Sequence, residues 1–179
     1  MKIAITGAQS TGKSTLLNAI KKDELRDGVL SGYVFNDELT RSIKERGIVI
    51  NENGDNLTQL LTINVHVSNI IQPKFVSDRC IIDAVCYTHW LYKNGKIDEW
   101  VMDYSTKVLQ QIIFSYDHIF YLPNELPIED DGIRSNNEKF RNEIVELFEY
   151  YIKTYNLPVI TLTGSVQDRV KQFYNTLKQ

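Results

Sequence analysis

The sequence predicts an α/β fold with a mostly parallel sheet, because short apolar runs alternate with longer amphipathic segments along the chain. The chain has 179 residues, of which 42% are hydrophobic and 24% are charged. This balance is ordinary for a globular protein with a sizeable core. We find no internal repeat, low-complexity tract or linker, and we therefore expect residues 1–179 to form a single domain.

Five apolar runs are candidate strands, and the segments between them have the spacing of helices. The expected strands are Lys2–Thr6, Tyr33–Asn36, Lys74–Ser77, His118–Leu122 and Pro158–Leu162. The expected helices span roughly 13–25, 38–47, 57–72, 80–94, 98–115, 136–155 and 166–178. Asn94-Gly95 is a turn signal. Ser165, with Asp168 three residues later, predicts an N-cap for the last helix.

Residues 7–14 read GAQSTGKS and fill every fixed position of the pattern G-x-x-x-x-G-K-[ST]. An apolar run precedes the pattern and a helical segment follows it, as a phosphate-binding P-loop requires. The glycines allow successive N–H groups to point at phosphate oxygens, and the helix presents its positive end to the same anion. A glycine-rich turn with a surface lysine would not explain Lys13 and Ser14 together. The sequence therefore predicts binding of a nucleoside triphosphate.

The residue types in this loop indicate separate roles. We expect Lys13 to reach the β- and γ-phosphates and the Ser14 hydroxyl to ligate Mg²⁺, so the predicted cofactors are ATP and Mg²⁺. The other expected nucleotide contacts are Gly7, Gln9, Ser10, Thr11, Gly12 and Thr15.

Asp78 and Arg79 follow the third predicted strand. A carboxylate at that strand end often lies beside the Mg²⁺ site, which we expect for Asp78. Alternatively, Asp78 is the N-cap of the helix that begins near Cys80. Arg79 is a candidate for binding phosphate or substrate, or it is an ordinary surface arginine. Asp83 lies one helical turn later and can form a local ion pair with it.

Asp37, Glu38 and Arg41 follow the second predicted strand. Either carboxylate can accept a proton from a substrate hydroxyl, and Arg41 can hold an anionic group of that substrate. The alternative is that the acidic residues only complement the dipole of the next helix.

The longest irregular stretch runs from Pro123 to Ser135. Compact domains seldom keep such a loop without a use, so we interpret about 123–140 as a lid over the site. Arg134 on this lid is a candidate for stabilising the transferring phosphoryl group. Arg141, two helical turns further on, is a candidate for binding the substrate.

Composition narrows the class of protein. The net charge of −3 gives no general attraction to nucleic acid, although a local basic cleft is allowed. The chain shows no signal peptide and no apolar run near the ~18 residues that span a bilayer, so we expect a cytoplasmic protein with no membrane partner. Cys80 and Cys86 fit buried, reduced residues, and the three histidines lack the spacing of a zinc site.

With these motifs in order, the chain resembles the P-loop nucleoside and nucleotide kinases. More narrowly, it is similar to the group that includes the ribosylnicotinamide kinase domain and related phage-encoded P-loop proteins. The resemblance rests on the P-loop, Glu38-Leu39-Thr40-Arg41, Ser77-Asp78, Tyr116-Asp117, Asp130-Asp131-Gly132-Ile133-Arg134 and Thr163-Gly164.

This resemblance implies a three-layer fold with sheet order 2-3-1-4-5. It also implies that Gly164 lies near the adenine of ATP. Ribosylnicotinamide kinases tend to have a second acidic residue after position 78, where this chain has Arg79. An Asp-Arg pair is more like thymidylate and deoxynucleoside kinases, in which the arginine meets the substrate.

The predicted function is transfer of the ATP γ-phosphate to a small nucleoside or (deoxy)nucleoside monophosphate. One alternative is a polynucleotide or modified-base kinase, against which the acidic net charge argues. Another is a P-loop ATPase that acts as a switch on a partner protein. The chain has no Asn/Thr-Lys-x-Asp guanine motif and no acidic pair on the third strand, which argues against a GTPase and a ring ATPase.

Overall fold

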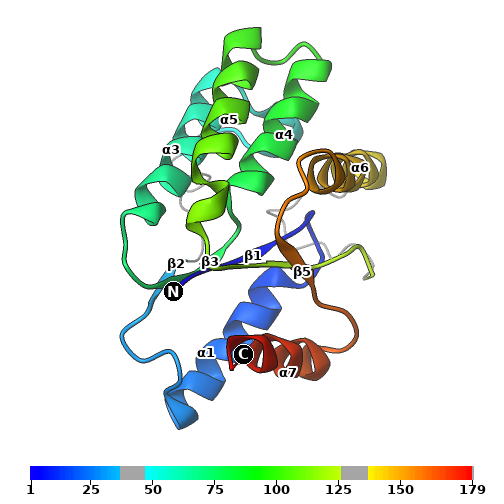
Figure 1. The fold of residues 1–179 in the computed structure, drawn as a ribbon. Coiled ribbons are helices and arrows are strands. Elements are labelled where there is room, and N and C mark those ends of the chain that lie inside the picture. Colours follow the sequence, from blue (N-terminus) through cyan, green and yellow to red (C-terminus); the bar gives the residue numbers. More distant parts are fainter. Residues whose placement is uncertain (37–46, 126–136, 179) are drawn as a thin grey trace.

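A five-stranded sheet forms the centre of the protein (Figure 1). The computed structural model describes residues 1–36, 47–125 and 137–178. The strands are β1 (Lys2–Thr6), β2 (Val34–Asn36), β3 (Phe75–Asp78), β4 (His118–Tyr121) and β5 (Val159–Thr161). All neighbouring strands are parallel, and their order is β2-β3-β1-β4-β5. Both the α/β class and the strand order implied by the family resemblance are therefore confirmed.

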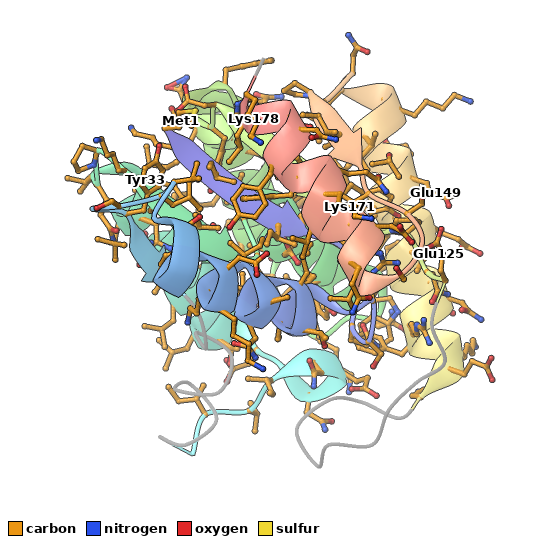
Figure 2. The ribbon with its side chains drawn as sticks, turned by 90° about the horizontal axis from the view of Figure 1, so that it is seen from below. Met1, Tyr33, Glu125, Glu149, Lys171 and Lys178 are labelled. Atoms are coloured by element: carbon orange, nitrogen blue, oxygen red, sulfur yellow. The ribbon has the colours of Figure 1, made fainter. Side chains whose placement is uncertain are left out.

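Helices cover both faces of the sheet and complete a three-layer architecture (Figure 1). The described helices are α1 (Lys13–Asp27), α3 (Asn56–Ile70), α4 (Ile81–Lys93), α5 (Glu99–Ile112), α6 (Glu138–Thr154) and α7 (Val166–Leu177). Two short 3₁₀ turns, Asn51–Asn53 and Ile113–Ser115, accompany them. Helices α1 and α7 lie together under the sheet, as the view from below also shows (Figure 2). Helices α3 to α6 lie over the opposite face.

The central strand β1 explains why both faces must be covered. Ile3 and Ile5 are fully buried among the side chains of α1 and α7, whereas Ala4 is fully buried in the other core, beneath α4 and α6. Successive side chains of a strand point to opposite faces, so a strand that is apolar at every position needs a layer on each side. The predicted buried state of both cysteines is confirmed, since Cys80 and Cys86 are free and fully buried.

Most element boundaries differ from the predicted ones by one or two residues, which is the usual spread at frayed ends. The predicted helix 98–115 is wrong at its end, because α5 stops at Ile112 and a 3₁₀ turn follows. The N-cap predicted at Ser165 is confirmed, and Asp168 completes a capping box. The predicted helix 38–47 lies almost wholly outside the described residues, as does most of the predicted lid. In the part of the chain that is described, no helix is long and apolar enough to cross a membrane.

His66 is a buried polar residue in the layer formed by α3 and α4. It is 2% exposed, and neither ring nitrogen has a hydrogen-bond partner among the described residues. Burial lowers its pKa to about 4; Asp83 partly opposes this effect and Arg79 adds to it. The folded protein therefore keeps this imidazole neutral at pH values where an exposed histidine would be protonated.

This burial predicts a loss of stability in mild acid. Below pH 6.5 the His66 imidazole is protonated in the unfolded chain but stays neutral in the folded protein. The free energy of unfolding therefore falls as the pH falls toward 4. Between pH 7.5 and pH 5, wild type should lose about 2 kcal/mol more than His66→Leu. Urea denaturation of both proteins at the two pH values measures this difference. Equal losses would show that His66 does not cause the pH dependence.

Candidate functional site

The phosphate loop, residues 7–14, connects β1 to α1 in a conformation that needs its glycines. Gly7 has φ +143°, and a Cβ at this position would lie 2.5 Å from the carbonyl oxygen of Leu122. Gly12 has φ +86° and is the N-cap of α1. Side chains are strained in this region of backbone space, and at Gly7 they would also collide with β4's end. The loop therefore packs against the neighbouring strand while its backbone curls around the start of α1.

Lys13 lies within this curl. Its side chain is buried, and its ammonium donates hydrogen bonds to the carbonyl oxygens of Gly7 (2.7 Å) and Ala8 (2.6 Å). A third, longer contact reaches Thr11 Oγ1 at 3.4 Å. A full positive charge is thus held above the N-terminal end of α1, in a site that also offers loop N–H groups.

Two further buried donors belong to the same loop. Gln9 is 3% exposed and Ser10 is 5% exposed. Within the described part of the chain, Gln9 Nε2 and Ser10 Oγ have no hydrogen-bond partner. Buried polar atoms are nearly always paired, so these two indicate a ligand that carries hydrogen-bond acceptors.

Ser14 and Asp78 meet at the edge where β1 and β3 end. Ser14 Oγ donates to Asp78 Oδ2 at 2.7 Å, and Asp78 Oδ1 is buried without a hydrogen-bond partner among the described residues. A hydroxyl and a carboxylate with a spare oxygen fit a hard cation such as Mg²⁺, which also takes water and phosphate oxygens. The alternative that Asp78 is an N-cap is wrong, because Cys80 is the N-cap of α4.

Asp83 is the acid that completes this cap. It is 2% exposed, and its Oδ2 accepts hydrogen bonds from the Cys80 N–H (2.9 Å) and from Thr6 Oγ1 (2.6 Å). Its Oδ1 lies 3.1 Å from an Arg79 guanidinium nitrogen, so the predicted local ion pair is confirmed. One carboxylate therefore joins the end of β1, the start of α4 and Arg79.

Arg79 has an unusual backbone and a well-supported side chain. Its φ is +83°, which is strained for a non-glycine residue, and its N–H donates to the Ile5 carbonyl at 2.8 Å. The guanidinium lies over the Tyr87 ring, 5.6 Å from the centroid. Burial alone would lower its pKa, but Tyr87, Asp83 and Asp78 raise the pKa above its ordinary value. Arg79 thus remains a cation at any physiological pH.

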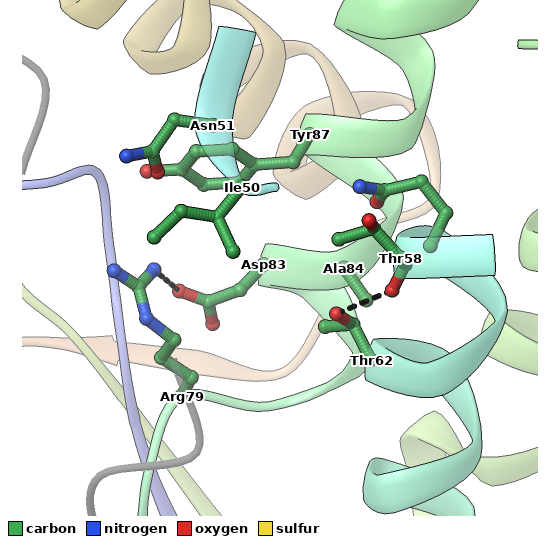
Figure 3. Close-up of a pocket in the computed structure, with 9 residues that line it drawn as sticks. Ile50, Asn51, Thr58, Thr62, Arg79, Asp83, Ala84 and Tyr87 are labelled. Atoms are coloured by element: carbon green, nitrogen blue, oxygen red, sulfur yellow. Dashed lines mark hydrogen bonds and ion pairs between the residues drawn. The ribbon is translucent and has the colours of Figure 1, made fainter. Parts of the chain in front are cut away.

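Arg79, Asp83 and Tyr87 also line a pocket of about 50 Å³ between α3 and α4 (Figure 3). Its other walls are mixed polar and apolar side chains, contributed by Ile50, Asn51, Thr58, Gln59, Thr62 and Ala84. Two of its residues bond directly to the strand and loop described above. Tyr87 donates to Gln9 Oε1 at 2.7 Å, and Asp83 accepts from Thr6.

A larger hollow of about 650 Å³ lies between α4 and α6, where Trp90, Glu143 and Tyr150 form part of its wall. No residue of the phosphate loop lines either cavity, but Tyr87 in the wall of the smaller pocket donates to Gln9 of that loop. The smaller pocket is therefore the better candidate for a substrate that must meet the loop.

A second buried arginine supports the loop from the opposite side. Arg169 on α7 is 3% exposed and donates to the Thr11 carbonyl (2.8 Å) and to Glu125 (2.8 Å). The same Glu125 carboxylate accepts from the Gly164 N–H at 3.2 Å, close to the start of α7 (Figure 2). Glu125 precedes the undescribed residues 126–136, so the base of the predicted lid bonds directly to the support of the phosphate loop.

The remaining predicted residues are only partly described. Asp37, Glu38, Arg41 and Arg134 lie outside the described residues. Arg141 lies in the first turns of α6 and is 4% exposed. Thr15 is exposed on α1.

Sequence reasoning missed Gln9's partner Tyr87 and the role of Glu125. The spacing of Arg79, Asp83 and Tyr87 at four-residue steps was the available signal for one shared helix face.

The glycine-rich loop with Lys13 and Ser14 lies between β1 and α1 of a parallel sheet of order β2-β3-β1-β4-β5. These features define a P-loop protein. The chain belongs to the AAA domain family, whose model matches residues 2–169. Comparison with curated protein sequences gives no match.

Solved structures show the same fold. The chain is similar to deoxyadenosine kinase from M. mycoides with the products dCMP and a flexible dCDP bound, with TM-score 0.70 and 18% identity over 99% of this chain and 98% of that one. It is also similar to NadR protein in complex with NR, with TM-score 0.72 and 17% identity over 98% of this chain and 50% of that one. At these identities the likeness establishes the fold alone, a three-layer α/β fold around a parallel sheet.

The hydrogen bonds of Asp83 predict a large cost of removing it. Asp83→Ala leaves the Cys80 N–H, the Thr6 hydroxyl and the Arg79 cation without their acceptor. We expect the free energy of unfolding to fall by about 3 kcal/mol, measured by urea denaturation at pH 7.

Asp103→Ala is the matched control, since Asp103 is an exposed aspartate on α5. It should change stability by less than about 0.5 kcal/mol. If both variants lost the same stability, Asp83 would not be the anchor described above.

Proposed function

We propose that the protein is an ATP-dependent kinase that transfers the γ-phosphate to a small nucleoside or (deoxy)nucleoside monophosphate. The observation that carries this proposal is the direct contact between the pocket and the phosphate loop, through Tyr87 and Gln9. An acceptor in that pocket would lie beside the end of a triphosphate held by the loop. Phosphoryl transfer needs this juxtaposition, because the enzyme contributes chiefly positioning and charge.

The donor half of the site fits ATP with Mg²⁺. Lys13, the loop N–H groups and the start of α1 would bind the phosphates, with Gly7, Gly12, Thr11 and Thr15 completing the loop. Ser14 and Asp78 would hold Mg²⁺, which neutralises phosphate charge when bound. The buried, unpaired oxygen of Asp78 supports this assignment.

The acceptor half combines one cation with several neutral polar groups. Arg79 is suited to an anionic or hydroxyl-rich acceptor, and Thr58, Gln59 and Thr62 offer hydrogen bonds from α3. Solved relatives of similar fold carry dCMP and NR, which supports a ligand of nucleoside or nucleotide size.

Other residues keep the roles that side-chain chemistry and the family resemblance predict for them. Asp37 or Glu38 would accept the proton of a substrate hydroxyl, and Arg41 and Arg141 would bind the acceptor. Arg134, on the predicted lid, would stabilise the negative charge of the transferring phosphoryl group. The family resemblance places Gly164 near the adenine, and its N–H donates to Glu125 at the base of that lid.

A panel of acceptors tests the proposed function. ADP release from ATP would be measured with nucleosides, nucleoside monophosphates, nicotinamide riboside and a DNA 5′ end. We expect turnover with a nucleoside or nucleoside monophosphate. Activity with the DNA end alone would favour the polynucleotide kinase, and ATP hydrolysis unaffected by any acceptor would favour an ATPase switch.

Lys13→Ala tests the donor half of the site. Loss of the ammonium should lower kcat/KM by about 100-fold or more, because it removes charge stabilisation of the phosphoryl group. Lys153→Ala is the control, since Lys153 is exposed in the last turn of α6, outside the predicted lid. Circular dichroism should show the same fold in both variants. Near-normal turnover by Lys13→Ala would contradict the assignment of the loop.

A further inference from the structure

In the side-chain amide of Gln9, the oxygen accepts a hydrogen bond and the nitrogen has no partner among the described residues. Its Oε1 accepts the Tyr87 hydroxyl at 2.7 Å, while its buried Nε2 has no partner among the described residues. A buried N–H group without an acceptor is destabilising, so one that a folded protein keeps points to a ligand that can accept its hydrogen bond. Gln9 is in the phosphate loop itself, which makes a phosphate oxygen the natural acceptor.

Tyr87 contacts both halves of the proposed site. Its hydroxyl reaches Gln9 in the phosphate loop. Its ring faces the Arg79 guanidinium at 5.6 Å from the ring centroid, and both residues line the acceptor pocket (Figure 3). Arg79 is in turn paired with Asp83, which bonds back to Thr6 just before the loop. These contacts form a closed ring of side chains, so the Tyr87 hydroxyl has little freedom to move away from Gln9.

We propose that Tyr87 is a positioning residue that holds the Gln9 amide with its NH₂ group toward the phosphoryl group in transfer. The inference rests on the proposed kinase function and adds a specific donor to it. Tyr87 occupies the carbonyl end of the amide, which leaves the NH₂ end without a partner among the described residues. Gln9 is then the catalytic residue, and Tyr87 acts through it.

A fixed N–H donor at this junction would add to the charge stabilisation assigned to Lys13 and the metal. In the transfer, a bond forms between the acceptor oxygen and the γ-phosphorus, and the bond to the β,γ-bridging oxygen breaks with its electron pair going to ADP. A hydroxyl acceptor also loses its proton, which Asp37 or Glu38 would accept in the proposed function. Negative charge remains on the three equatorial oxygens of the transferring group, and a fixed N–H donor stabilises it without reorganising. The Gln9 amide forms hydrogen bonds only and exchanges no atoms.

A double-mutant cycle tests this arrangement. Tyr87→Phe keeps the ring beneath Arg79 and removes only the hydroxyl, whereas Gln9→Ala removes the amide. Each should lower kcat by about 10-fold or more, with a smaller change in the KM for ATP. The double variant should be no slower than Gln9→Ala, because both changes remove the same donor.

Tyr104→Phe is the matched control. The Tyr104 hydroxyl also donates to a side-chain amide, Asn64 Oδ1 at 3.1 Å, but on the exposed surface of α3 and α5. It should leave kcat unchanged. Multiplicative losses in the Tyr87–Gln9 double variant, or an unchanged kcat in Tyr87→Phe, would overturn the proposal.

A second readout separates this inference from the proposed function. ADP with aluminium fluoride mimics the transferring phosphoryl group, and its affinity can be measured by calorimetry without any acceptor. Tyr87→Phe and Gln9→Ala should each weaken it about 10-fold relative to ADP alone. If no acceptor is phosphorylated but this loss is seen, the kinase proposal fails and the role of Gln9 stands. Equal affinity in wild type and both variants overturns the role of Gln9.

Discussion

The Asp83 carboxylate holds together the parts of the site that come from different segments. It is buried and accepts from the last side chain of β1, from the first N–H of α4 and from the Arg79 guanidinium. The Cys80 N–H and the Thr6 hydroxyl are buried and would be left unsatisfied if the carboxylate moved, and the partly exposed Arg79 would lose its ion pair. The bond to Thr6 fixes where the phosphate loop begins. The bond to Arg79 helps to offset the strain of a left-handed backbone at that residue.

The phosphate loop is supported from both sides by contacts that do not involve phosphate. Gly7 packs against the end of β4, and Arg169 on α7 holds the Thr11 carbonyl. On the other face, Tyr87 holds Gln9. A cradle that is rigid before a ligand binds can present its donors without reorganisation, which is the most effective form of electrostatic stabilisation. Glu125 extends the support of the loop to the base of the predicted lid.

Local patterns in the sequence predicted much of this structure. The P-loop, the helix cap at Ser165 and the Arg79–Asp83 pair each depend on residues within eight positions of one another. The strand order came from the resemblance to P-loop kinases, since apolar runs alone do not specify which strands are neighbours. Only the alternative that Asp78 caps α4 is wrong, because aspartate is a preferred cap and the backbone turn at Arg79, which makes Cys80 the cap, leaves no local signal.

By itself, the sequence determined that a strand, a phosphate loop and a helix follow one another, and which residue types offer charge and hydroxyl groups to a nucleotide. Only the tertiary structure decided that Asp83 bonds to Thr6, that Tyr87 bonds to Gln9 and that Arg169 bonds to Thr11. The partners are 77, 78 and 158 residues apart. A hydrogen bond forms only when two atoms come within about 3 Å. No spacing rule sets such a distance between remote residues, because the packing of helices onto both faces of the sheet sets it.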